Sequence, residues 1–488
     1  MTNKSNPAVI LGLALALASI ATSNPLLTLA GGLTLSAIWW GAFNNAISSV
    51  VACMLSVQWL QASSKIWLAN LIGISLEEPT SRWITGLSLF VVTPQTNAAI
   101  YLALAAIAAL SLGARVFVPN VALSGSDFTR FAPRGLVLIY LPLLLVSQVA
   151  GPYFGGGLAQ LISAIGALRL APIVLLIGHW FYTRRGGIAL AAVFGAEILI
   201  GFLSFFSDWK TVLALAGITL ISLARHAWRR SWPLLIGTFV SLLLLGTVWT
   251  IIKPNYREIL NAGTGQQVIL ISPDEQAAAL SDSILSIKPQ DLSDGFLDLL
   301  SRVSYVDFLA ETLRSVPARI EHQNGGLWGE AFQNILTPRL LFPDKPPLPS
   351  DSVRTMQYTG RRLASDSSGT SISIGYVGES YIDFGAFGAI VTAFFMGLVY
   401  GVGVLGLVRL SRSGGAALGL ALTISFLWPV QQFEMSNVKL VGALGWGWAG
   451  SALFAVILWP RLEPFVLMRK PAGQVTPPAD HARSRRGP

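Results

Sequence analysis

Charged residues are scarce in this chain of 488 amino acids: 12% are Asp, Glu, Lys or Arg, whereas 53% are hydrophobic. An ordinary soluble domain carries about 25% charged residues. A chain this apolar has too few polar groups to cover its surface in water, so much of that surface must face lipid. The composition excludes a cytosolic enzyme, a disordered protein and a secreted disulfide scaffold.

Cysteine and the usual catalytic signatures are also nearly absent. The single cysteine, Cys53, lies in an apolar run, so no intrachain disulfide forms and packing is its simplest role. The sequence contains no metal-ligand cluster, no Walker loop and no GxSxG motif. We therefore predict no cofactor and no metal, and neither a nucleotide-driven pump nor a metalloprotease is supported.

Long hydrophobic runs are what the chain has instead, and a helix needs about 20 apolar residues to cross a membrane. Ten runs are clear candidates: 43–62, 97–118, 135–150, 158–181, 187–206, 210–224, 233–252, 384–408, 415–430 and 440–459. Runs 8–22 and 26–40 are shorter, and 66–76 and 83–92 are paired half-helices, interfacial helices or thin spans. The predicted fold is an all-α polytopic membrane protein with about 12 (10–14) transmembrane helices and one large periplasmic loop containing short helices.

The remaining charges are unevenly distributed. Residues 253–381 hold 15 of the 24 acidic residues and 11 of the 33 basic residues. This distribution divides the chain into N-terminal transmembrane helices (1–252), a large loop (253–381), C-terminal transmembrane helices (382–460) and a disordered basic tail (461–488).

The basic residues of the short loops predict the orientation. Loops with Arg130/Arg134, Arg184/Arg185 and Arg409/Arg412 alternate with loops that hold almost no bases. The positive-inside rule places the basic loops and the tail in the cytoplasm and the large loop outside. The net charge of +9 therefore reflects topology, and we predict no nucleic-acid partner.

Within the large loop, residues 299–316 have one apolar helical stripe, and Pro317 ends the predicted helix. One interpretation is a helix on the membrane surface with a solvated polar face. The other is that Arg302 and Arg314 point into a cavity and hold phosphate.

The next stretch, residues 320–351, contains five prolines in twelve residues: Pro338, Pro343, Pro346, Pro347 and Pro349. Such density predicts a stiff extended loop that presents Arg339, Asp344 and Lys345. Rigid presentation of cations suits a pyrophosphate clamp. Alternatively, the prolines brace an exposed loop, and Arg339 pairs with a nearby carboxylate.

Acidic residues stand where the large loop enters the next membrane helix. Glu379, Tyr381 and Asp383 lie at the predicted outer mouth, with the two acids four residues apart on one helical face. A carboxylate at a helix N-terminus is favoured by capping alone, which accounts for one acid. Glu434, with Lys439, is placed to line the same mouth.

Three other ionisable residues are candidates. Arg169 and Glu197 lie within successive predicted spans, where charges are costly. They either neutralise each other, or Arg169 reaches outward to a lipid-linked phosphate. His322 is the only histidine predicted outside the membrane, and hence the one available there for acid–base chemistry.

Two strings carry a resemblance to a known family: TPRLLFPDKPPLP (337–349) and GYVGESYIDFGAFGAI (375–390). They resemble the oligosaccharide repeat-unit polymerases of bacterial surface polysaccharide assembly, the Wzy-like group. The matches cover 329–388: Gly329, Pro338-Arg339, Pro343 with Lys345-Pro346, Glu379, Tyr381, Phe384-Gly385 and Gly388.

The resemblance implies a glycosyltransferase of the bacterial inner membrane that extends O-antigen, capsule or exopolysaccharide from polyprenyl-pyrophosphate-linked repeat units. Arg339 and Lys345 would stabilise the departing pyrophosphate, and Glu379 would be the base or orient the acceptor. The predicted substrate-binding residues are Arg169, Arg302, Arg314, His322, Tyr381, Asp383 and Glu434. The implied partners are the lipid-linked oligosaccharide, the bilayer, and a chain-length regulator and flippase of the same pathway.

Three alternatives remain. A ligase-like polyprenol-dependent glycosyltransferase would share the cavity but use another acceptor. A flippase or transporter for lipid-linked sugar would show internal repeats and central polar residues, and the sequence shows no repeat. A non-catalytic membrane scaffold is the third.

Overall fold

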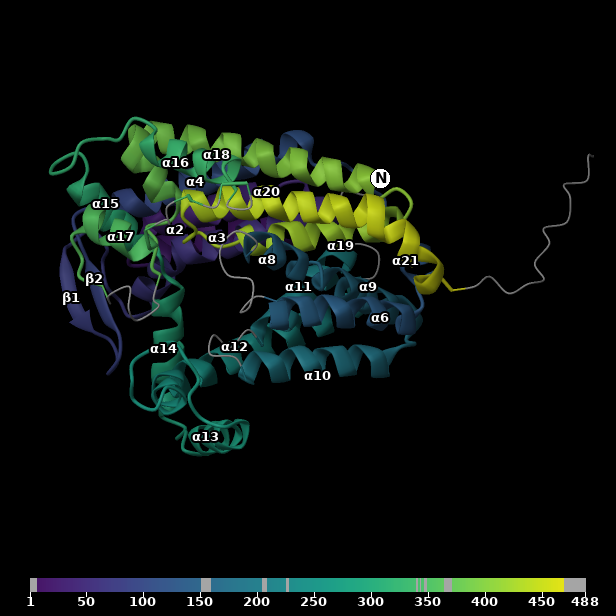
Figure 1. Cartoon of the computed structure of the whole chain (residues 1–488). Helices are drawn as coiled ribbons and strands as arrows, with labels where there is room; N and C mark the ends of the chain where they lie inside the picture. Colours follow the sequence, from purple (N-terminus) through teal and green to yellow (C-terminus); the bar gives the residue numbers. More distant parts are fainter. Residues whose placement is uncertain are drawn as a thin grey trace, which may run out of the picture.

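The long apolar runs form long helices that lie side by side (Figure 1). The computed structural model describes residues 7–150, 159–203, 209–224, 228–338, 341, 342, 344, 345, 349–363 and 371–468. It is 75% helical. The helices of the apolar body are α1 (Pro7–Ala18), α2 (Pro25–Trp39), α3 (Ala46–Leu71), α4 (Thr96–Phe117), α5 (Gly125–Thr129), α6 (Pro133–Leu145), α8 (Ala159–Ala167), α9 (Leu170–Thr183), α10 (Gly187–Leu203), α11 (Lys210–Ala224), α12 (Trp228–Leu260), α18 (Tyr376–Leu410), α19 (Gly415–Leu427), α20 (Asn437–Leu453) and α21 (Trp459–Val466).

Six helices in the described part of the chain are long and apolar enough to cross a membrane: 46–71, 96–117, 162–183, 229–260, 376–410 and 437–466. Shorter apolar helices of 10–17 residues accompany them. The prediction of a helical protein with several membrane-compatible helices is thus confirmed in outline.

Small residues let the central helices α4 and α18 approach closely. A Cβ atom on Gly397 would lie 2.1 Å from the carbonyl oxygen of Leu110, and one on Gly401 would lie 2.4 Å from that of Ala114. Gly397 and Gly401 form a GxxxG spacing, which is typical of packing between helices in membranes. This contact fixes α18, which carries Glu379, Tyr381 and Asp383, against the core.

A two-stranded hairpin replaces the span or half-helix considered for residues 83–92. Strand β1 (Thr80–Trp83) pairs antiparallel with β2 (Leu89–Val92), with Thr80 opposite Val92. The β2 residues are aliphatic or aromatic and alternate, so that Phe90 and Val92 are buried. Alternating burial is typical of a strand, and a run of ten residues is too short for a membrane-spanning helix. The prediction of a span or half-helix at 83–92 is therefore wrong.

Five helices lie wholly within the described residues of the large loop: α13 (Pro273–Leu285), α14 (Asp291–Val303), α15 (Val306–Ser315), α16 (Gly326–Leu336) and α17 (Asp351–Thr359). Figure 1 shows α15 and α17 beside the hairpin, at one end of α18 and α20, with α21 at the other end. The membrane-type helices also extend beyond the predicted limits of this loop, since α12 runs to Leu260 and α18 begins at Tyr376.

The helix predicted over 299–316 is two helices, α14 and α15. The break occurs because the backbone N–H of Tyr305 donates to the carbonyl of Gln61 (3.0 Å) instead of continuing the helix. The Tyr305 hydroxyl also donates to the carbonyl of Ser373 (2.6 Å). Below this anchor, the buried Lys65 of α3 forms an ion pair with Asp307 and donates to the carbonyl of Val91 (2.5 Å).

Candidate functional site

Arg354 forms the centre of a buried charge cluster at the start of α18. Its Nη1 lies 3.2 Å from Glu379 Oε1, and its Nη2 lies 2.6 Å from Glu330 Oε2. The Glu379 side chain is 1% exposed and that of Arg354 is 10% exposed. Burial alone would lower the pKa of Arg354, but its ion pairs with Glu379 and Glu330 raise it above the ordinary value.

The second oxygen of Glu379 links this cluster to the N-terminus of α20. Glu379 Oε2 accepts a hydrogen bond from the backbone N–H of Asn437 at 2.7 Å. The side-chain amide of Asn437 and the hydroxyl of Ser436 are buried with no hydrogen-bond partner among the described residues. Buried polar groups are rarely left unsatisfied, so this spot is suited to a polar ligand or water.

Asp383 acts as an N-terminal cap for another helix. Its two carboxylate oxygens accept hydrogen bonds from the backbone N–H groups of Leu327 (3.1 Å) and Trp328 (2.9 Å) in the first turn of α16. The backbone carbonyl of Asp383 also accepts from Asn324 (3.1 Å). The sequence analysis considered a helix-capping role for one of the two acids. Asp383 has such a role, but it caps α16 and not the helix to which it belongs.

His322 lies against the same stretch of α18, as does Tyr381. The Nδ1 atom of His322 is 3.1 Å from the carbonyl oxygen of Ile382, which can only accept. Nδ1 therefore carries a proton, and Nε2 remains an available base in the neutral ring. The Tyr381 ring meets the histidine edge-on, with ring centroids 5.6 Å apart, and its hydroxyl donates to the carbonyl of Val316 (2.9 Å).

Gly385 separates this docking segment from the rest of α18. Its backbone has φ +71° and ψ −173°, a conformation that essentially only glycine adopts. The residues before the break, Glu379 to Asp383, bind the large loop, and the residues after it form the membrane-type helix.

The two cations predicted on the proline-rich loop have different outcomes. Arg339 lies outside the described residues. Lys345 donates to the carbonyl oxygens of Asn334 (2.8 Å) and Thr337 (3.1 Å) at the C-terminal end of α16, and also to the side-chain oxygen of Asn334. A cation is favoured at this end of a helix, so in the structure Lys345 stabilises α16.

Arg302 belongs to a second group of cations that the sequence analysis only partly identified. Lys253 of α12 lies close enough to Arg257, Arg302 and Lys210 for mutual electrostatic repulsion. We call these four residues the cation cluster. Lys253 and Arg257 are one helical turn apart, a spacing visible in the string KPNYR. Arg314, by contrast, is exposed in the last turn of α15.

Further charged residues connect the buried charge cluster around Arg354 with the cation cluster. Asp351, which influences Glu379 electrostatically, forms an ion pair with Lys439 (2.6 Å). Lys439 and Lys210 in turn both attract Glu434. Burial raises the pKa of Glu434 above its ordinary value, and the two lysines only partly offset this. Electrostatic interactions therefore link six residues, among which Asp351 and Lys439 are in direct contact. We call these six residues the charged row: Glu379, Asp351, Lys439, Glu434, Lys210 and Lys253.

Arg169 and Glu197 form the predicted ion pair, with Nε and Oε1 3.1 Å apart. Glu197 also accepts from the hydroxyl of Tyr140 (2.9 Å). This polar site joins α6, α9 and α10, and it is not part of the charged row. The neutralising interpretation of the pair is confirmed.

Sequence reasoning missed Arg354, Glu330 and Asn437. Arg354 follows the last proline of the proline-rich string by five residues, so extending that string would have included it. Glu330 and Asn437 gave no signal of their own. No group of three or more His, Cys, Asp or Glu side chains within the described ranges is arranged to hold a metal ion.

The structure is that of a helical protein with several helices that could span a membrane and with a polar site where α16 and α17 of the large loop meet the start of α18. Residues 136–442, more than half of the chain, match the family described as a domain of unknown function (DUF8712). The chain belongs to this family. Comparison with curated proteins and with solved structures found no match.

Proposed function

We propose that this protein is a multi-pass membrane glycosyltransferase that polymerises oligosaccharide repeat units carried on a polyprenyl diphosphate. Two motif residues shared with the Wzy-like polymerases support it, because Glu379 pairs with Arg354 of the large loop and Tyr381 bonds to Val316 of the same loop. The observation that carries most weight is the charged row, which brings acidic and basic residues together from the large loop and from several apolar helices. A lipid-linked diphosphate carries its charge between its sugar and its lipid tail, and therefore near the membrane surface, where a group of charged side chains could bind it.

The proposed topology has about 12 crossings, in which the shorter apolar helices cross as well as the six long ones. The most apolar of the six, 229–260, supports embedding, because only 17% of its most apolar window is buried inside the protein. Such a surface is unfavourable in water and favourable in lipid. The basic short loops then place the large loop in the periplasm and the C-terminal tail in the cytoplasm of a bacterium.

The chemical step is transfer of the growing chain. A hydroxyl oxygen of the incoming repeat unit attacks the anomeric carbon of the lipid-linked chain, and a new C–O bond forms. The bond between that carbon and the phosphate oxygen breaks, and the diphosphate leaves with the electron pair. The hydroxyl proton goes to a base on the protein.

The residues are assigned to these roles as follows. The cation cluster, with Arg339, stabilises the negative charge on the leaving diphosphate. His322 Nε2 is assigned as the base, because Nδ1 of this ring is bound to the carbonyl oxygen of Ile382. Glu379 was expected to be the base or to orient the acceptor. Because it is buried and already bound to Arg354 and Asn437, we assign it the second role, together with positioning the loop.

The test uses purified full-length protein with a polyprenyl-diphosphate-linked repeat unit, without nucleotide sugar, and sizes the products on a gel. A ladder of longer saccharides is the expected result. Loss of one charge-assisted contact is expected to slow product formation at least about tenfold in Lys253→Gln. The exposed Lys288→Gln of the same loop is the matched control and keeps its rate.

Two outcomes would overturn the proposal. Movement of the intact lipid across sealed vesicles without a ladder would identify a flippase. Transfer of the saccharide to a different lipid acceptor, without extension, would identify a ligase-like enzyme.

A further inference from the structure

A cavity of about 210 Å³ lies between α2, α3 and α4, far from the charged row. Its lining includes Ser48 in the first turn of α3, and Ser111 and Arg115 near the end of α4. Lys65 lies near the other end of α3, and the hairpin precedes the other end of α4. The cavity is many times the roughly 15 Å³ that one water needs.

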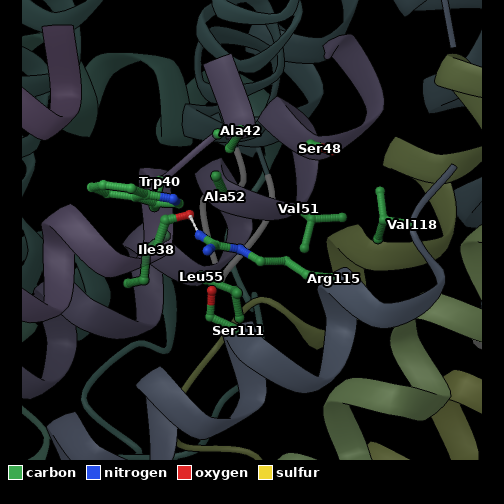
Figure 2. A pocket seen from close by; sticks show the side chains of 11 residues that line it. Ile38, Trp40, Ala42, Ser48, Val51, Ala52, Leu55, Ser111, Arg115 and Val118 are labelled. Atoms are coloured by element: carbon green, nitrogen blue, oxygen red, sulfur yellow. Dashed lines mark hydrogen bonds between the residues drawn. The ribbon is translucent and has the colours of Figure 1, made fainter. Parts of the chain in front are cut away.

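Arg115 places a positive charge at this cavity, and this charge has no carboxylate partner among the described residues. Its Nη2 donates to the carbonyl oxygen of Ile38 (2.6 Å) and to that of Ala37, which caps the end of α2 (Figure 2). Its Nε and Nη1 have no hydrogen-bond partner, and no carboxylate forms an ion pair with it, within the described ranges. Capping alone would not require a cavity beside the guanidinium.

A second polar group in the cavity, the hydroxyl of Ser111, also has hydrogen-bonding capacity left for a ligand. Ser111 is 3% exposed, and its hydroxyl makes no hydrogen bond with the described residues. Most buried hydroxyls have a partner, so this one is available to a ligand. Apart from Ser48, the other lining residues are mostly apolar and include Val51 and Leu55 (Figure 2). The cavity thus combines a cation and a hydroxyl donor with apolar walls.

We infer that this cavity binds the phosphate of an anionic membrane phospholipid. Basic pockets between membrane helices near the bilayer surface bind such head groups. Trp40, which lines the cavity, is 71% exposed, and tryptophan is enriched at the membrane–water interface. The neighbouring Leu112 and Val116 of α4 are also more than half exposed, so an acyl chain has an apolar surface to follow. These features favour a lipid over free phosphate.

The experiment measures retention of phosphatidylglycerol by the full-length protein in detergent, by native mass spectrometry. Arg115→Gln removes the charge and is expected to weaken retention about tenfold, whereas Arg115→Lys keeps most of it. Ala52→Leu fills the cavity without changing the charge and is expected to weaken retention as well. Arg185→Gln, an exposed arginine outside the cavity, is the control and keeps wild-type retention.

Three outcomes would overturn the inference. Equal losses in Arg115→Gln and Arg185→Gln would indicate a general charge effect. Retention of phosphatidylcholine as strong as that of phosphatidylglycerol would remove the role of the anionic head group. Full displacement of the lipid by an equal concentration of glycerol phosphate would identify a site for a soluble phosphate.

Discussion

Two half-buried arginines, one at each end of the helical bundle, differ in whether their charge is balanced by a carboxylate. Arg354 lies between Glu379 and Glu330, so its charge is balanced within the protein. Among the described residues, Arg115 donates hydrogen bonds to the carbonyl oxygens of Ala37 and Ile38, and no carboxylate pairs with it. A balanced arginine orders the structure around it, whereas an unbalanced one retains attraction for an anion. We therefore assign architecture to the first and lipid binding to the second.

The sharpest test of this difference removes the charge of Arg354. Arg354→Met leaves Glu379 buried and unpaired, which is expected to cost about 3–5 kcal/mol of unfolding free energy. Arg361→Met is the control: its pair with Glu311 is partly exposed and is expected to contribute less than about 1 kcal/mol. Tryptophan fluorescence during thermal unfolding in detergent measures both. Equal losses in the two variants would contradict the assignment of an architectural role to Arg354.

The next largest effect concerns the break in α18. Gly385→Ala places a side chain at φ +71° and ψ −173°, which is expected to cost about 1–3 kcal/mol. Gly329→Ala, in α16 with open space around the new methyl group, is expected to be neutral or to gain up to about 1 kcal/mol. The same unfolding assay compares them, and a Gly385→Ala protein as stable as the Gly329→Ala protein would argue against the break.

A smaller effect is expected from removing the cap of α16. Asp383→Ala leaves two backbone N–H groups without their acceptor and is expected to cost about 1–2 kcal/mol. Hydrogen exchange should accelerate at Leu327 and Trp328. Asp274→Ala, an exposed acid in α13, should leave exchange at these two amides unchanged, and any acceleration there would point to a general loosening.

The smallest effect depends on pH. Burial raises the pKa of Glu434 in the folded state, so the folded protein binds a proton more tightly than the unfolded chain. Stability from this group is complete below the ordinary glutamate pKa and is lost as pH rises through the raised value. Glu434→Gln should therefore raise the melting temperature at pH 8 and have no effect at pH 4. A gain that is the same at both values would exclude a titration of Glu434.

Composition and local pattern predicted the elements better than the contacts. Arg169 and Glu197 were paired correctly because both are charges within adjacent apolar helices, where few partners exist. The helix over 299–316 was wrong because the break depends on Gln61, which lies in a distant part of the sequence. Periodicity contains no information about such a contact.

The candidate site shows the same limit. Glu379 and Asp383 were recognised as a pair, yet they bind different partners, Arg354 and the first turn of α16. Arg354 has no distinctive sequence motif, and its importance comes entirely from burial beside two carboxylates. Lys345 was expected to hold pyrophosphate, but its donors reach the end of α16. The catalytic role of Arg339 and the roles of the predicted substrate-binding residues stay predictions.

The ion pair between Lys65 and Asp307 also has a consequence for biosynthesis. The two residues are 242 positions apart in the chain. At about 5–20 residues per second, a ribosome needs roughly 10–50 s to make the intervening segment. During that interval Lys65 has no Asp307 to bind. The ion pair that joins α3 to α15 therefore forms only after most of the large loop's first half has been synthesised.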